Sequence, residues 1–273
     1  VKQRKGEGAM CIQMVDKEKY IDTYLHRLGI KQLPVDMKEA LFLLQAKHLY
    51  SIPFENLDIV ANKPISLNDD DIFEKLIVNK RGGYCFELNQ SFYCLLKALG
   101  YKVATYCARV WIDGFATTPK KIHQAVVVNI NGESYVAEVG FGNAVAPLSP
   151  LLLTSGIVQR QGEQAYVFVL DEQWGWILKV QIGEKWQEIF SFDETIKDYD
   201  SDFELGSFFC QYAQESPFSK GAIVFMRTET GRKSLVGKTV QIVHGGQQMV
   251  IHCDSEKEVK RHLEQDFGIL GNF

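Results

Sequence analysis

Apolar residues in the first third of the chain recur at helical spacing. Two stretches show this spacing most clearly, Tyr20, Ile21, Tyr24, Leu25 and Leu28 in the first, and Leu88, Phe92, Leu95, Leu96 and Leu99 in the second. Gly29 and Gly100 end these two predicted helices. Between them, a capping-box pattern of Asp36 with Glu39 predicts a helix that runs through Leu49, and residues 69–78 predict a short one. The region up to residue 100 is therefore expected to be mostly helical.

The pattern changes after residue 100 to short runs of β-branched and aromatic residues. These predict strands over 101–112, 123–130, 134–139, 164–170, 175–182 and 185–192. The Asn131-Gly132 pair between the second and third runs is a strong signal for a two-residue hairpin turn. Several short antiparallel strands in succession predict a small barrel or sandwich.

The last part of the chain mixes helices and strands. Helices are predicted over 202–214 and, with Ser255 as the N-cap, up to Asp266. Strands are predicted over 222–227, 234–243 and 249–253. The shifts of pattern near residues 100 and 195 come without clear linkers, so we expect an α+β protein whose three parts pack together, preceded by a disordered extension over 1–15.

Composition and charge exclude some partners and locations. The 273 residues are 46% hydrophobic and 23% charged with a formal net charge of −4, which gives no reason to expect nucleic acid or an anionic membrane as the main partner. No run of about 18 apolar residues predicts a transmembrane helix. The first ten residues are basic and polar rather than typical of a secretory signal, so we expect a cytoplasmic protein.

Cysteine placement directs attention to one residue. The six cysteines are widely spaced, and because no CxxC pair occurs we expect neither a zinc site nor any other bound metal. Cys85 follows Gly82 and Gly83 and stands where the helix containing Leu88 begins. Unpaired backbone N–H groups at a helix start favour a thiolate, which is the form of cysteine that attacks carbonyl carbon.

The hairpin supplies a candidate base and a group to orient it. A two-residue turn pairs Ile130 with Glu133, and continuing that ladder sets His123 opposite Gly140, with Glu138 on the same face. His123 and Glu138 are then diagonal neighbours, roughly 7–8 Å apart at the backbone, and the glycine leaves room for the imidazole. An ordinary polar pair on an exposed face would give the same pattern. The other histidines fit structural or surface roles better, so Cys85, His123 and Glu138 form the candidate nucleophile, base and orienter.

These residues belong to a set of motifs that resembles the arylamine N-acetyltransferases. The motifs are RGGYCFELN at 81–89, His123, EVGFG at 138–142, PFENL at 53–57, SPF at 216–218 and RTETGR at 227–232. The resemblance implies a helical bundle carrying the nucleophile (16–100), a β-barrel carrying the histidine and carboxylate (101–194) and an α/β lid (195–273). It also implies that acetyl passes from acetyl-coenzyme A through an acetyl-cysteine to an arylamine, hydrazine or arylhydroxylamine.

The resemblance also implies roles for individual residues. The family normally has aspartate at the third triad position, where this chain has Glu138, one methylene longer. Substrate-pocket roles are implied for Phe141, Ile122 and Phe54, although packing in the core explains Phe141 and Phe54 equally well. Tyr212 and Phe218 match a coenzyme A contact region. Finally, the resemblance suggests an internal ion pair of Arg81 with Glu55, and cofactor phosphates near Lys120 and Lys121, which are otherwise simply solvated.

Three other functions fit parts of the same pattern. An amide synthase of the same fold, acting on polyketide acyl chains, would share the three candidate residues and differ in the acyl donor. A cysteine hydrolase would use water in place of the amine. A non-catalytic binding module would keep only the fold. Discharge of an acetyl-cysteine by an aromatic amine, and only slowly by water, would separate these functions from acetyl transfer.

Overall fold

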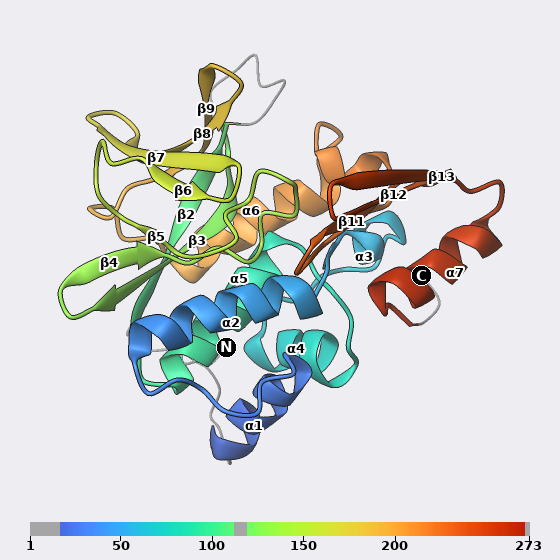
Figure 1. The fold of residues 1–273 in the computed structure, drawn as a ribbon, viewed down its shortest axis with the longest axis horizontal. Coiled ribbons are helices and arrows are strands. Elements are labelled where there is room, and N and C mark those ends of the chain that lie inside the picture. Colours follow the sequence, from blue (N-terminus) through green and yellow to red (C-terminus); the bar gives the residue numbers. More distant parts are fainter. Residues whose placement is uncertain (1–16, 112–118, 271–273) are drawn as a thin grey trace.

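The computed structural model describes residues 17–111 and 119–270. The expected extension over 1–15, and the end of the predicted strand at residue 112, lie outside these ranges. Helices occupy the first part of the chain, an antiparallel sheet the middle, and a smaller sheet with two helices the last part (Figure 1). The α+β class predicted from the pattern is confirmed.

The helices of the first part form where the sequence predicts them, except α3 (Leu57–Val60), which was not expected, and the helix over 69–78, which continues as a π-helical turn. They are α1 (Lys17–Arg27), α2 (Met37–Ser51), α3 (Leu57–Val60), α4 (Asp69–Phe73), the π-helical turn η1 (Glu74–Val78) and α5 (Cys85–Ala98). The side chain of Asp36 accepts a hydrogen bond from the backbone N–H of Glu39 at 2.9 Å, as the capping pattern predicted. Fully buried side chains of α2 and α5, Leu41, Leu44, Phe92 and Leu95 among them, belong to one large core.

The middle of the chain forms a nearly closed eight-stranded antiparallel barrel. Its strand order is β5-β4-β3-β2-β9-β8-β7-β6. The strands are β2 (Lys102–Val110), β3 (Lys121–Ile130), β4 (Glu133–Val136), β5 (Leu151–Leu152), β6 (Gln159–Gln161), β7 (Gln164–Asp171), β8 (Gly175–Ile182) and β9 (Lys185–Phe192). The two short strands β5 and β6 have no clear signal in the sequence, because two or three residues are too few to show alternation.

The β3–β4 hairpin has the predicted register. Asn131 and Gly132 both have positive φ, 53° and 90°, as the turn requires, and Ile130 faces Glu133. The ladder ends at the Val127–Val136 pair, however. The strand predicted over 134–139 is therefore wrong at its end, because β4 stops at Val136. Glu138 therefore lies just beyond the end of a strand.

The last part of the chain is joined to the first by a strand from each. In the five-stranded sheet, β1 (Phe54–Glu55) pairs with β10 (Ile223–Thr228), followed by β11 (Gly231–Val236), β12 (Thr239–His244) and β13 (Gln247–His252). The single strand predicted over 234–243 is wrong: Gly237, with a φ of 58°, turns the chain between β11 and β12. Helix α6 (Asp200–Tyr212) lies against β3, and α7 (Glu256–Phe267) packs on the small sheet (Figure 1).

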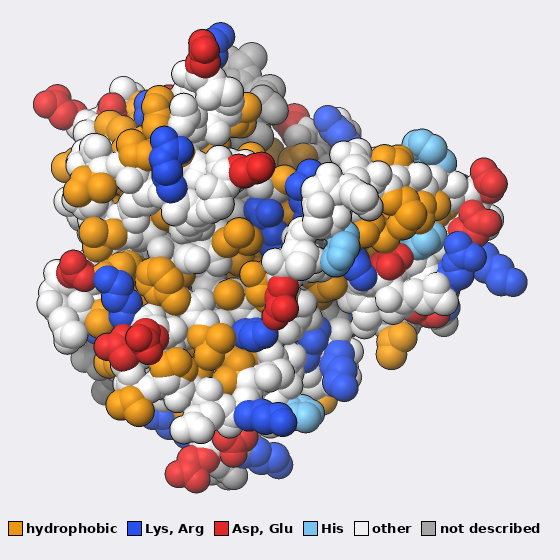
Figure 2. Space-filling view, viewed as in Figure 1, with side chains coloured by type: hydrophobic (Ala, Val, Ile, Leu, Met, Phe, Trp, Pro, Cys, Tyr) orange, Lys and Arg blue, Asp and Glu red, His pale blue; other side chains and the backbone are white. Residues whose placement is uncertain are grey.

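The surface carries charges of both signs. On the face shown in Figure 2, acidic and basic side chains occur together over the helical part and the two sheets, and apolar side chains appear over the small sheet. Within the described residues, no helix is both long and apolar enough to cross a membrane.

Candidate active site

Helix α5 begins at the candidate nucleophile. Cys85 is its first residue, and the Glu87 carboxylate accepts a hydrogen bond from the backbone N–H of Tyr84 at 3.1 Å, which caps the helix. Gly82, three residues before Cys85, is required by close packing, because a Cβ at this position would lie 2.2 Å from the carbonyl oxygen of Pro53. The resulting tight turn buries Cys85, whose exposed fraction is 3%.

Burial changes the expected ionisation of this thiol. Removal from water, followed by the proximity of Cys210 and Glu138, raises the pKa of Cys85 well above its ordinary value, although backbone N–H groups at the helix start act to lower it. The backbone N–H groups at the helix start thus favour the thiolate, as expected, but the desolvation of this buried thiol is the larger effect on its pKa. A thiolate at this position needs a proton acceptor that becomes a cation beside it.

The predicted histidine–carboxylate pair is present. Nε2 of His123 lies 2.7 Å from Oε2 of Glu138, and the side chains are 2% and 1% exposed. The hairpin thus brings the two residues together although Glu138 lies outside the strand. The alternative of a polar pair on an exposed face is excluded by this burial.

Gly140 has a different role from the expected one. A Cβ on Gly140 would lie 2.9 Å from the Cα of Cys85 and 2.9 Å from the side-chain nitrogen of Asn89. The missing side chain therefore makes room for the start of α5. The expectation that Gly140 faces His123 is wrong because β4 has ended before this point.

Two buried side-chain amides hold Glu138 in place, and neither was singled out from the sequence. Asn89, one turn after Cys85, donates from Nδ2 to Oε1 of Glu138 at 3.0 Å and accepts from the backbone N–H of Val139 at 3.1 Å. Oε1 of Gln45 on α2 accepts from the backbone N–H of Glu138 at 3.0 Å. The signal for Asn89 is its place in RGGYCFELN on the face of Cys85, whereas nothing in the sequence indicates Gln45.

The thiol lies against the peptide unit that joins Ile122 to His123. Sγ of Cys85 donates to the carbonyl oxygen of Ile122 at 3.5 Å, and that carbonyl is bonded directly to the nitrogen of His123. Because Nε2 of the imidazole faces Glu138, the nitrogen that remains for the thiol is Nδ1. The structure therefore places the three candidate residues in one buried group.

Aromatic rings surround this group. The ring of Phe141 lies 5.3 Å from the imidazole of His123, and the ring of Phe54 contacts Phe218 at 5.9 Å. A Cβ on Gly142 would lie 2.3 Å from the Phe54 ring, so that ring is pressed against the 140–142 segment. These three rings, Phe141, Phe54 and Phe218, form what we call the inner wall. All three were given pocket or cofactor roles from the sequence.

Other predicted ligand residues lie elsewhere or are already paired. Tyr212 is 55% exposed at the end of α6 and packs on Phe208, away from the inner wall. Lys121 forms an ion pair with Asp198 at 2.8 Å, and the ammonium of Lys120 lies 5.0 Å from the centre of the Phe209 ring. The two lysines are therefore not simply solvated.

A network of ion pairs lies behind the helix start. Arg81 binds Glu55 at 2.6 Å and Asp58 at 3.1 Å, and Lys75 binds Asp58 and Glu87 at 2.7 Å each. The expected pair of Arg81 with Glu55 is thus part of a chain of charges that ends on the cap of α5.

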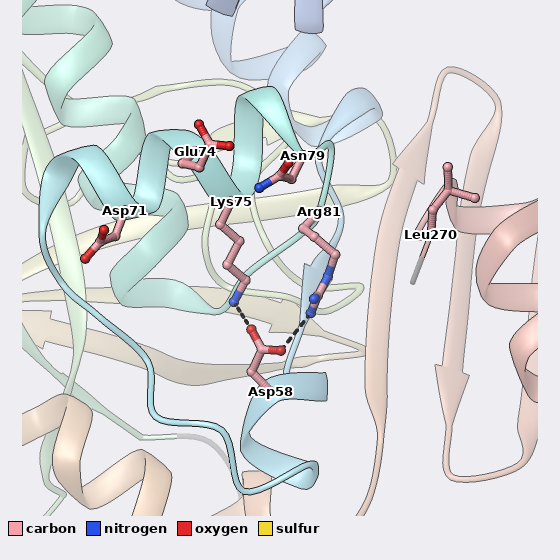
Figure 3. A pocket seen from close by; sticks show the side chains of 7 residues that line it. All are labelled: Asp58, Asp71, Glu74, Lys75, Asn79, Arg81 and Leu270. Atoms are coloured by element: carbon pink, nitrogen blue, oxygen red, sulfur yellow. Dashed lines mark hydrogen bonds and ion pairs between the residues drawn. The ribbon is translucent and has the colours of Figure 1, made fainter. Parts of the chain in front are cut away.

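A surface pocket adjoins this network but is separate from the candidate triad. Figure 3 shows its lining, in which Lys75 and Arg81 both point to Asp58. The lining residues are Asp58, Asp71, Glu74, Lys75, Asn79, Arg81 and Leu270. Because both cations are bound to carboxylates and none of the lining residues contributes to the triad, this pocket is not the candidate catalytic site.

Comparison with known proteins shows which family the chain belongs to. The family model described as N-acetyltransferase matches residues 38–271. The arylamine N-acetyltransferase / N-hydroxyarylamine O-acetyltransferase of Salmonella typhimurium is 31% identical over 252 residues, covering 92% of this chain and 89% of the relative. The chain belongs to the arylamine N-acetyltransferase family.

Solved structures of arylamine N-acetyltransferases have the same fold. The Salmonella typhimurium enzyme has a TM-score of 0.86 at 30% identity, over 92% of this chain and 91% of that one. The Mycobacterium marinum enzyme in complex with CoA has a TM-score of 0.83 at 29% identity, over 91% and 92%. A Bacillus cereus arylamine N-acetyltransferase, described as having a unique Cys-His-Glu catalytic triad, has a TM-score of 0.83 at 25% identity, over 92% and 99%.

Proposed function

We propose that this arylamine N-acetyltransferase family member transfers an acetyl group from acetyl-coenzyme A to arylamines, hydrazines or arylhydroxylamines through an acetyl-Cys85 intermediate. The observation that carries the proposal is the buried group of Cys85, His123 and Glu138 at the start of α5. Membership of the family supplies the acyl donor and the class of acceptor.

In the first half-reaction, His123 makes the buried thiol nucleophilic. Glu138 accepts a hydrogen bond from the Nε2–H group of the imidazole and leaves Nδ1 as the base. The thiol hydrogen turns from the carbonyl of Ile122 toward Nδ1 and is transferred to it, which gives a thiolate beside an imidazolium that the carboxylate stabilises. The thiolate attacks the acetyl carbonyl, and backbone N–H groups at the start of α5 stabilise the oxyanion.

In the second half-reaction, an amine replaces coenzyme A. An aromatic amine is weakly basic and largely neutral at pH 7, so it can attack the acetyl-cysteine while His123 accepts its proton. Phe141 and Ile122 are assigned to the acceptor pocket because the Phe141 ring adjoins the imidazole and the Ile122 carbonyl adjoins the thiol. Phe54 is assigned to it because its ring is pressed against Gly142, the residue after Phe141. An apolar wall of this kind disfavours water and so protects the thioester from hydrolysis.

Glu138 takes the position that aspartate normally has in the family. Its longer side chain reaches the imidazole from beyond the end of β4, while Gln45 and Asn89 hold its backbone and one carboxylate oxygen. The Cys-His-Glu triad described for the Bacillus cereus relative supports the same assignment here.

Two aromatic residues are assigned to the coenzyme A site. Phe218, which packs on Phe54 and Tyr84, adjoins the inner wall, and Tyr212 stands at the exposed end of α6. We assign both to coenzyme A, with Phe218 nearer the thioester. The division into a helical bundle (16–100), a barrel (101–194) and a lid (195–273) belongs to the same proposal.

Mass spectrometry of the acyl-enzyme tests the proposal. Mixing with acetyl-coenzyme A should add one acetyl group to Cys85, and an aromatic amine should remove it much faster than water does. Cys85→Ser should take up no acetyl, whereas Cys253→Ser, which changes a buried cysteine of the small sheet, should behave as wild type. Failure of acetyl-coenzyme A to form any adduct on Cys85 would contradict the proposal.

A further inference from the structure

The buried face of helix α6 lies against the candidate nucleophile. Only Gly206, Ser207 and Cys210 of α6 are buried, and they occupy one side of the helix. The opposite side is exposed, with Leu205 and Phe208 more than 60% accessible to solvent. The contacts that hold α6 in place are therefore made by its buried side.

Two contacts fix this side against the start of α5. A Cβ on Gly206 would lie 2.7 Å from the carbonyl oxygen of Lys121 and 2.8 Å from the ring of Phe86, so the glycine allows the helix to approach β3 and the residue after Cys85. One residue further on, the hydroxyl of Ser207 is hydrogen-bonded to the hydroxyl of Tyr84, the residue before Cys85. Both neighbours of the nucleophile thus contact α6.

The third buried residue of this face is a second thiol. Sγ of Cys210 lies 3.8 Å from the carbonyl oxygen of Ile122, the same oxygen that Sγ of Cys85 approaches to 3.5 Å. The two sulfur atoms cannot be further apart than the sum of these distances. Cys210 is completely buried, and the acetyl-transfer steps make no use of it.

We propose that Cys210 is a resolving cysteine, which forms a reversible disulfide with Cys85 when a peroxide oxidises the nucleophile. The Cys85 thiolate attacks the peroxide, which is reduced to an alcohol or water, and becomes a sulfenic acid. The Cys210 thiol then attacks the Cys85 sulfur, the S–S bond forms, and the hydroxyl leaves with the thiol proton as water. This proposal rests on the proposed role of Cys85 as a nucleophile.

The position of Cys210 suits this reaction because both sulfurs lie next to the same carbonyl oxygen. The disulfide requires a movement that brings the two sulfurs to bonding distance, about 2 Å. A sulfenic acid without a resolving thiol is oxidised further to irreversible acids. The disulfide instead blocks acetyl transfer until a thiol reductant restores it.

Peptide mapping of the full chain tests the proposal. The reduced protein is treated with one equivalent of hydrogen peroxide, free thiols are blocked, and the chain is digested without reductant. Wild type should lose two thiols, yield a Cys85–Cys210 cross-linked peptide lighter by two hydrogen atoms, and regain acetyl transfer on addition of dithiothreitol. Cys210→Ala should lose acetyl transfer to peroxide but recover little of it, whereas the control Cys253→Ala should recover as wild type does.

Two results would overturn the proposal. One is the absence of a Cys85–Cys210 peptide in oxidised wild type, which needs no variant to fold. The other is equal recovery of Cys210→Ala and wild type after reduction. Acetylation of the reduced protein by acetyl-coenzyme A is measured in parallel, so that a chain which forms the disulfide but takes up no acetyl contradicts the proposed function and not the resolving role.

Discussion

Replacing Glu138 by glutamine tests the proposed orienting role most directly. Oε1 of Glu138 accepts from Asn89 and from the backbone N–H of Gly140, at 3.0 and 2.6 Å. Both groups can only donate in this arrangement, so the amide oxygen of the new side chain must take the Oε1 position. Its NH2 group then faces Nε2 of His123, which must accept, and the ring proton moves to Nδ1.

This change of tautomer removes the base while keeping the shape of the site. With Nδ1 protonated, His123 cannot take the thiol proton, and burial keeps the pKa of Cys85 too high for a thiolate to form alone. The equivalent change in a serine protease triad lowers kcat by about 10⁴-fold. We expect a loss of about 10³- to 10⁴-fold in the acetylation rate, or about 4–5.5 kcal/mol of transition-state stabilisation.

The assay is the pre-steady-state acetylation of Cys85 by acetyl-coenzyme A or an activated acetyl ester, followed by transfer to an arylamine. Thermal unfolding of each variant confirms that the fold is retained. Glu133→Gln is the matched control, since this carboxylate belongs to the same hairpin but bonds Tyr135 at the surface. Acetylation rates equal to wild type in Glu138→Gln would show that Glu138 has no part in the mechanism.

The remaining predictions concern packing and buried charge. Gly140→Ala should lower kcat by about 100-fold, because its Cβ would displace the start of α5 at Cys85; a wild-type rate in single-turnover assays would contradict this role. Lys75→Met should cost about 3–5 kcal/mol of unfolding free energy at neutral pH, since it leaves the buried Glu87 carboxylate without its cation. Burial raises the pKa of Glu87 even with that cation present, so the cost should shrink in urea titrations as the pH falls toward 5 and the carboxyl takes a proton, and a pH-independent cost would argue against the ion pair. Burial lowers the pKa of His48 to about 3 from 6.5. Because the unfolded chain binds the proton first, stability should fall by about 1.4 kcal/mol per pH unit as the pH drops from 6.5 toward 3. His48→Gln should remove this slope, and an unchanged slope would exclude His48 as its source.

The local elements of this fold follow from the sequence because short-range forces set them. The apolar spacing predicts α1 and α5, the Asp36 cap predicts α2, and the Asn131-Gly132 turn predicts the register of β3 with β4. Element ends were less predictable. The ladder stops before Glu138, and the turn at Gly237 divides a run that reads as one strand, since both depend on what the backbone packs against rather than on local propensity.

The candidate site divides in the same way. Its titratable residues could be named from the sequence because the nucleophile stands at a predicted helix start and the hairpin joins His123 to Glu138. Gln45 could not be named, because it reaches Glu138 from α2 across a long separation in sequence. A contact of this kind leaves no periodic signal in the chain.

Most helices, the hairpin register, the family and the three candidate catalytic residues could be inferred from the sequence alone. The burial of Cys85, the close contact of Gly140 with α5 and the nearness of Cys210 to Cys85 became visible only in the folded structure. Local patterns follow from the backbone geometry of adjacent residues. Desolvation, close contact and the meeting of two thiols at one carbonyl arise only when α5, β3 and α6 are packed together.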